Sequence, residues 1–131
     1  MNVYYLFLVK KDVYNVYSKN SYSLYKLFYN LYNLNRVDFN YGVTLYNQLC
    51  DNINVSRLKY YFELTDNIRK GNNRYMMEDK SLVLLRPSCI LYKKEGDFDT
   101  LFYLLNSFSH YFFACNFKCD DYFWVKNKIN Y

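Results

Sequence analysis

The cysteines and the single histidine are the side chains of this sequence that could bind a metal ion or act as a nucleophile. Zinc sites need such ligands in closely spaced pairs, and the closest pair is Cys115 and Cys119, with His110 nearby in the chain. Cys115 lies in a predicted strand and Cys119 beyond its end, which favours two ordinary thiols. A nucleophilic pair of His110 with a cysteine is conceivable, but a lone histidine at a predicted turn between helix and strand is typical of a structural role.

Two pairs of carboxylates could perform acid–base chemistry if the members of a pair faced each other across a cleft. The first pair is Asp97 and Asp99, and the second is Asp120 and Asp121. We expect Asp97 to cap a helix and the second pair to lie in a turn, where aspartate hydrogen-bonds to the backbone. Only three glycines occur, too scattered for a phosphate-binding loop. The sequence therefore predicts no catalytic residue, no metal site and no cofactor.

The net charge of the chain is mildly basic. Lysine and arginine number 17 against 12 acidic residues, which gives +5. This charge helps an acidic partner to approach, but the cations form no basic block longer than the pairs Lys10-Lys11 and Lys93-Lys94. An alternative function is a small cytosolic nucleic-acid-binding protein that uses the 18 tyrosines and the excess charge. Its signature would be a steep loss of binding with added salt.

Length and composition bound the class of protein. The chain has 131 residues, of which 52% are hydrophobic, and this predicts one folded domain over residues 1–131. No apolar run approaches the roughly 20 residues that span a bilayer, and the first residues lack the pattern of a signal peptide. We therefore expect a cytoplasmic protein with no membrane segment. Because cytoplasmic thiols are kept reduced, no disulfide is expected.

The first third of the chain predicts a strand and two helices. Residues 3–9 are apolar on both alternating faces, as in a strand covered on both sides. A short helix is expected over residues 12–17, with Asp12 as its cap and with Val13, Val16 and Tyr17 at helical spacing. A longer helix begins at Ser21 or Ser23. Its amphipathic stripe comprises Leu24, Leu27, Phe28, Leu31 and Leu34.

The middle of the chain predicts two more helices and a turn. One helix covers residues 41–53 and the other covers residues 55–68, each with apolar residues on one side. Residues 69–73 are rich in glycine and asparagine and are expected to form a turn. The apolar sides comprise Leu45, Leu49 and Ile53 in the first helix and Leu58, Tyr61, Phe62 and Thr65 in the second.

The second half changes to short β-prone runs. Residues 74–78, 81–85 and 89–93 are separated by turn signals and predict an antiparallel meander. A helix follows Gly96, and a last strand is expected over residues 111–117, again apolar on both faces. The buried stripe of that helix comprises Phe98, Leu101, Phe102 and Leu105.

These elements predict an α+β fold with a small sheet of about four to five strands and several packed helices. The apolar first and last strands, over residues 3–9 and 111–117, are expected at the centre of the sheet as neighbours or near neighbours, because each needs cover on both faces.

Four segments carry a resemblance to a known family. Residues 5–17 form an apolar strand that ends in lysine and leads into an acidic helix start, and residues 75–79 contain a Met-Met strand. Residues 96–98 are a Gly-Asp-aromatic helix entry, and residues 116–125 form a closing segment with a tryptophan. In order and spacing these segments resemble the sporulation inhibitor of replication family (SirA). The resemblance implies a single SirA-like α+β domain.

The resemblance also implies a function without chemistry. A protein of this family is expected to bind the N-terminal domain of the replication initiator DnaA and to block its productive assembly at the origin, as a monomer before binding and without touching nucleic acid directly. The implied partner surface comprises Val13, Tyr14 and Tyr17 on the first helix, with Asn47 or Gln48 on the third. Tyr17 is the expected anchor and Tyr14 the second, because interface energy concentrates in a few aromatic residues.

The same residues also have a purely structural interpretation. Val13 and Tyr17 at helical spacing are equally compatible with core contacts of the first helix. In that case Tyr14 and Asn15 would face solvent.

Overall fold

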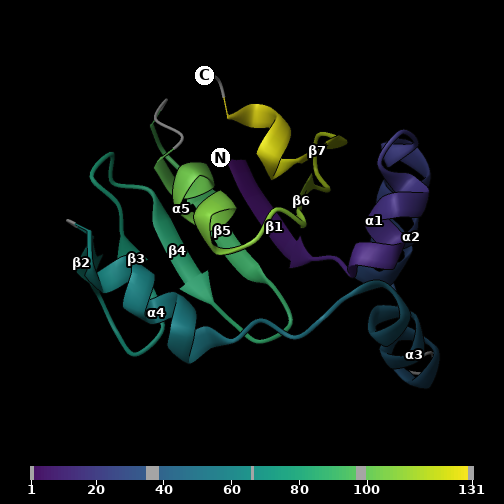
Figure 1. Cartoon of the computed structure of the whole chain (residues 1–131), viewed down its shortest axis with the longest axis horizontal. Helices are drawn as coiled ribbons and strands as arrows, with labels where there is room; N and C mark the ends of the chain where they lie inside the picture. Colours follow the sequence, from purple (N-terminus) through teal and green to yellow (C-terminus); the bar gives the residue numbers. More distant parts are fainter. Residues whose placement is uncertain (1, 35–38, 66, 97–99, 130–131) are drawn as a thin grey trace.

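The computed structural model describes residues 2–34, 39–65, 67–96 and 100–129 (Figure 1). Its helices and strands form a mixed α+β fold. The helices are α1 (Lys11–Tyr17), α2 (Ser21–Tyr32), α3 (Phe39–Leu49), α4 (Val55–Glu63), α5 (Thr100–Phe108) and the short 3-10 helix η2 (Val125–Lys128). The strands are β1 (Asn2–Leu8), β2 (Ile68–Arg69), β3 (Arg74–Met76), β4 (Leu82–Leu85), β5 (Ile90–Lys94), β6 (Phe112–Asn116) and β7 (Asp121–Trp124).

The strands form one antiparallel sheet in the order β2-β3-β4-β5-β1-β6-β7. The meander of β3, β4 and β5 is as predicted. Strand β1 pairs with β5 and with β6, so that Leu6 lies opposite Ile90 on one side and Ala114 on the other. The predicted strands over residues 3–9 and 111–117 are therefore neighbours, and neither is an edge strand.

The expected number of strands was too small. The sheet has seven strands in the part of the chain that the structure describes, and β7, which follows the strand predicted to be the last, lies at an edge. Strand β2 has only two residues, which is too short to show an alternating pattern. The sequence predicts a turn for both Asp120 and Asp121, but Asp121 is the first residue of β7. Asp120 does adopt the turn conformation, with φ of 53°.

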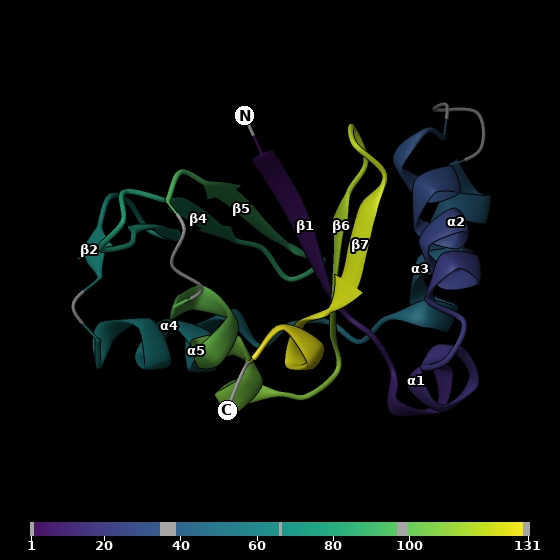
Figure 2. The same cartoon turned by 90° about the horizontal axis from the view of Figure 1, so that it is seen from above.

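Helices cover the sheet unequally on its two faces (Figure 2). Helices α4, α5 and η2 enclose the first core on one face, and α2 with the end of α3 encloses the second core on the other face, over β1, β6 and β7. The first core comprises Tyr4, Leu6, Ile53, Leu58, Phe62, Tyr75, Met77, Val83, Leu85, Ile90, Tyr92, Leu101, Phe102, Leu105, Phe112, Ala114 and Val125. The second core comprises Val9, Leu24, Tyr25, Phe28, Leu49, Cys50, Phe113, Cys115, Phe117 and Trp124.

Strand β1 contributes to both cores, as its two apolar faces predicted. Tyr4 and Leu6 lie in the first core, while Tyr5 and Phe7 pack against the second. The ring of Phe7 stacks on Phe28 of α2, with 4.2 Å between the ring centroids. Successive side chains of a strand point to opposite faces, so one short strand anchors both layers of helices.

The predicted helices over residues 41–53 and 55–68 are both too long. Helix α3 ends at Leu49, because Cys50 forms a β-bridge with Val9 and the Ile53 N–H donates to the Pro87 carbonyl at 2.7 Å. Ile53 is buried in the first core from a loop, away from the rest of its predicted helix side. Helix α4 ends at Glu63, and Ile68 belongs to β2.

The remaining helices follow the prediction more closely. Helix α2 begins at Ser21 and buries Leu24 and Phe28, and α5 buries Leu101, Phe102 and Leu105. Asp97 and Phe98, the predicted cap and first stripe residue, lie outside the described residues. None of the helices in the described part of the chain has the length and apolar character needed to cross a membrane.

Candidate protein-binding surface

Helix α1 follows β1 directly and lies over the end of the second core. The Lys10 N–H donates to the Leu49 carbonyl at 2.9 Å, and the Lys10 carbonyl accepts from the Tyr14 N–H at 2.9 Å. Lys10 occupies the position before the helix and makes no side-chain cap, so Asp12 is a first-turn residue and not the predicted cap. None of the seven residues of α1 is fully buried. The helix is therefore held at its edges and keeps part of its apolar surface open.

Tyr14 attaches α1 to the C-terminal segment of the chain. Its ring meets the edge of Trp124 at 4.7 Å and lies 5.2 Å from the ring of Tyr111. The Lys126 ammonium lies 4.1 Å above the same ring. Tyr14 is thus half-buried, whereas the structural interpretation placed it in solvent.

The other apolar residues of α1 divide between core and solvent. Val13 and Tyr17 are half-buried against the second core. Val16, which shares their helical spacing, is 71% exposed, and Asn15 is exposed beside it. The periodicity grouped Val16 with the buried stripe because it cannot tell which side of so short a helix meets the sheet. Its exposure was the feature of this surface that the sequence did not reveal.

Asn47 and Gln48 lie in the last turn of α3, and both are exposed. The next residue, Leu49, is buried, and its carbonyl is the acceptor of the Lys10 N–H. The end of α3 is further held by Tyr46, whose hydroxyl donates to the Ser88 carbonyl at 2.9 Å. The backbone contact between Lys10 and Leu49 therefore joins the two segments that carry the sequence-predicted binding residues.

The residues that could have formed a catalytic group are not brought together. His110 precedes β6 and Asp120 follows its far end, with a strand of about 17 Å between them. Cys115 is fully buried in that strand, and burial raises the pKa of its thiol well above the usual range. The Nδ1 atom of His110 lies 2.9 Å from the Asn106 side-chain oxygen. His110, Cys115 and Asp120 therefore do not form a common catalytic group.

Asp120 and Asp121 bind two different tyrosines. The Tyr25 hydroxyl donates to Asp120 at 2.7 Å from the second core, and the Tyr4 hydroxyl donates to Asp121 at 3.0 Å from the first core. Burial, reinforced by the hydrogen bond to Asp121, raises the pKa of Tyr4 to about 12. Burial and the bond to Asp120 raise the pKa of Tyr25 in the same direction. The two carboxylates face opposite sides of the sheet and share no cleft.

Metal-binding geometry is also absent from the described residues. Across residues 2–34, 39–65, 67–96 and 100–129, no three histidine, cysteine or acidic side chains gather closely enough to hold an ion. Burial raises the pKa of Cys50 as well, with a further contribution from nearby Cys89, so neither Cys50 nor Cys115 supplies a thiolate at neutral pH. The predicted carboxylate pair Asp97 and Asp99 lies outside these ranges.

Fold and site together describe an α+β protein whose buried tyrosines and thiols serve packing and whose candidate site is a partly exposed surface formed by α1 and the last turn of α3. The family model described as sporulation inhibitor of replication protein SirA matches residues 2–128, nearly the whole chain. The chain belongs to the SirA family. The description of this family names an inhibitor of replication in sporulation. A comparison with curated proteins finds no match.

Proposed function

We propose that this protein inhibits replication initiation by binding the N-terminal domain of DnaA through α1 and the last turn of α3. Membership of the SirA family is the observation that carries the proposal, because it supplies the inhibitory role. The contact surface is composed of Val13, Tyr14 and Tyr17 together with Asn47 and Gln48.

The packing of α1 supports this choice of surface. No side chain of α1 is completely buried, whereas α5 buries three. In α1 the half-buried residues Val13 and Tyr17 are fixed by the second core and still expose part of their apolar surface. Aromatic anchors that are already held in place lose little conformational entropy when a partner binds.

The inhibition needs no chemical step. A protein bound to the N-terminal domain of DnaA covers a surface that the initiator needs for assembly at the origin, so occupancy alone determines the effect. The net charge of +5 speeds the encounter with an acidic partner and contributes less to the final affinity.

The decisive measurement is the affinity of purified DnaA N-terminal domain for Tyr17→Ala and Gln48→Ala, compared with the unmodified protein. We expect Tyr17→Ala to weaken binding by ~2 kcal/mol, roughly thirtyfold, because an aromatic anchor is lost. Gln48 is exposed, so Gln48→Ala should weaken binding by a smaller factor and leave the free energy of unfolding unchanged within about 0.5 kcal/mol.

Tyr60→Ala is the matched control, because Tyr60 is a tyrosine of α4 that is 62% exposed outside the proposed surface. Chemical denaturation of each variant separates binding from folding, since Tyr17 also contacts the second core. If Tyr17→Ala and Gln48→Ala both fold and both bind with the affinity of the unmodified protein, this surface is excluded as the binding site. An equal loss for Tyr60→Ala would show that the effect is not local.

A further inference from the structure

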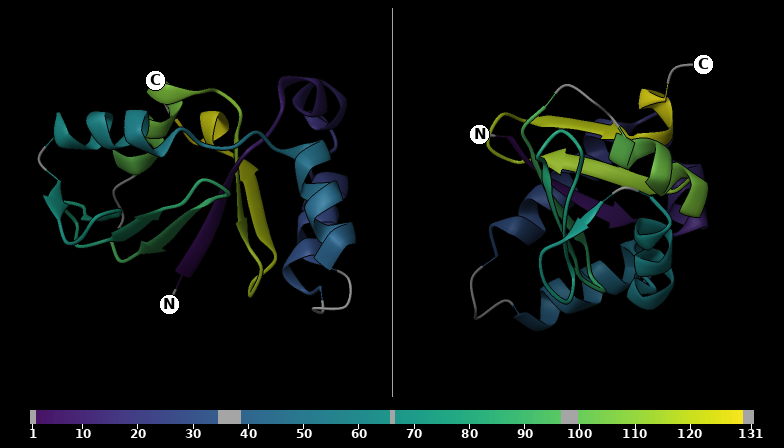
Figure 3. Two further views of the ribbon diagram at one scale, coloured as in Figure 1. Left: turned by 90° about the horizontal axis from the view of Figure 1, so that it is seen from below. Right: turned by 90° about the vertical axis from the view of Figure 1, so that its left-hand side faces the viewer.

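Among the described residues, no helix covers one face of the sheet over β3, β4, β5 and the first half of β1. Figure 3 shows these strands with helices on one side only. On the covered side, one row of paired residues crosses the four strands and is buried beneath α4 and α5. That row comprises Tyr75, Val83, Tyr92 and Tyr4.

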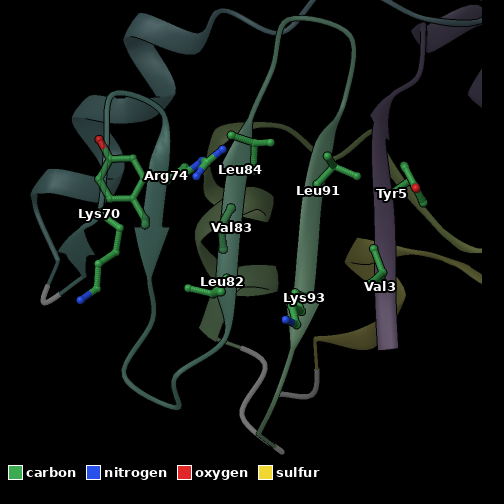
Figure 4. A pocket seen from close by; sticks show the side chains of 10 residues that line it. Val3, Tyr5, Lys70, Arg74, Leu82, Val83, Leu84, Leu91 and Lys93 are labelled. Carbon is green, nitrogen blue, oxygen red and sulfur yellow. The ribbon is translucent and has the colours of Figure 1, made fainter. Parts of the chain in front are cut away.

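The uncovered side presents two rows of paired residues from the same four strands. One row runs Arg74, Leu84, Leu91 and Tyr5, and the other runs Met76, Leu82, Lys93 and Val3. All of these residues except Met76 line a groove of about 600 Å³ (Figure 4). Leu82 is 41% exposed there, and the other apolar residues that line the floor from these rows are half-buried. We call this surface the sheet groove.

Cations border the sheet groove. Lys70 and Arg74 stand at its β3 side, where the Arg74 side chain extends toward Leu84, and Lys93 stands between Leu82 and Val3 (Figure 4). None of the ten lining residues is acidic. Within the described ranges, the one ion pair joins Arg69 to Glu63, and it involves none of the three bordering cations. The groove thus combines an apolar floor with positively charged residues at its border.

We propose that the sheet groove binds an amphipathic helix of a partner protein whose polar side is acidic. Four adjacent strands span about 14 Å, and a helix with its side chains is about 10 to 12 Å across, so one helix fits the floor. Its apolar side would cover Leu82, Leu84 and Leu91, and its carboxylates would face Arg74 and Lys93. This is a second contact surface, distinct from that of α1 and α3.

Charge and floor chemistry favour this occupant over two others. A second copy of the chain, packed groove to groove about a two-fold axis, would place the same cations against each other. Single-stranded nucleic acid needs aromatic platforms on which bases stack, and the centre of this floor is leucine. An acidic helix satisfies both the apolar floor and the cations at its border.

The test uses three synthetic helical peptides of about 14 residues, which are about 21 Å long. They share one apolar side and carry a net negative, zero or net positive charge on the other. Titration of the full chain at low salt should show the acidic peptide binding about tenfold more tightly than the basic one, with the gap closing as salt rises. Lys93→Glu should weaken the acidic peptide about fivefold to tenfold, and Leu82→Ser should weaken all three peptides.

Lys11→Glu is the matched control, since it makes the same charge change on α1. Its affinity for the acidic peptide should stay within about twofold of the unmodified protein. Equal binding of acidic and basic peptides, or binding by none of the three, overturns the proposal. Sedimentation of the chain alone tests whether a second copy fills the groove. A dimer that Leu82→Ser disrupts would show that it does, and would also overturn the proposal. Binding of the acidic peptide does not depend on whether Tyr17→Ala loses DnaA binding. Either proposal can therefore be refuted without the other.

Discussion

Two helices of this protein, α5 over the first core and α1 at the end of the second, differ in how completely their side chains are buried. In the first core, α5 buries Leu101, Phe102 and Leu105 entirely. In the second core, α1 buries nothing entirely, and its residues Val13 and Tyr17 are half-covered. Complete burial gives the larger hydrophobic contribution to stability, while partial cover leaves apolar area for a partner. The protein therefore contains one helix, α5, whose burial stabilises the fold, and another, α1, that keeps apolar surface exposed.

The two cores also differ in the kinds of side chain that they contain. Aliphatic residues make up more than half of the first core. The second core is rich in stacked rings, among them Phe28 on Phe7, Tyr25 on Tyr122 and Tyr32 on Phe117. Tyrosine rings pack through their faces and keep a hydroxyl at the boundary with water. Such a core tolerates an incomplete cover better than an aliphatic one.

The largest effect should come from Leu101→Ala in α5. Leu101 is 1% exposed, so its truncation leaves a cavity and should lower the free energy of unfolding by about 2 to 5 kcal/mol. Val16→Ala in α1 is the contrasting change, with an expected effect within about 0.5 kcal/mol because Val16 is exposed. Urea denaturation measures both. Similar losses for the two variants would contradict the difference between α5 and α1.

A second test uses alkaline pH and Tyr4. The pKa of Tyr4 in the folded chain is about 12, above the ordinary value of 10.0, so the protonated hydroxyl is the form that folding favours. This contribution is complete below pH 10 and is lost as the pH rises toward 12, with a size of up to about 2 to 3 kcal/mol. Tyr4→Phe should flatten the fall of the unfolding free energy in that range. Parallel curves for both proteins would show that Tyr4 does not carry the effect.

The smallest expected effect is that of Gly42→Ala in α3. An added Cβ would lie 2.7 Å from the Cδ1 atom of Leu34, which is the flexible end of a side chain and can move. Alanine is favoured over glycine within a helix by about 1 kcal/mol, so the net change should be neutral or stabilising by up to that amount. Thermal unfolding measures the difference. A clear destabilisation would mean that the Leu34 side chain cannot move away from the added methyl group.

The sequence predicted most of what local periodicity can report. Spacing alone shows which side chains can be buried together, so it located the stripes of α2 and α5, apart from Leu34 beyond the end of α2 and the undescribed Phe98. It also located the two-faced strands β1 and β6. The end of α3 was missed, since the bridge between Val9 and Cys50 joins residues far apart in the chain. A long-range pairing leaves no periodic trace at either segment.

The candidate surfaces divide in the same way. The sequence by itself determined that α1 would carry apolar and aromatic residues, and its resemblance to a family pointed to Tyr17 and Gln48. Only the tertiary structure decided that Val16 faces solvent, that Asp120 and Asp121 face apart, and that Leu82 and Lys93 share an open face of the sheet. The physical reason is that a pattern of residues specifies which surface can be covered, while the packing of distant elements determines which surface is covered.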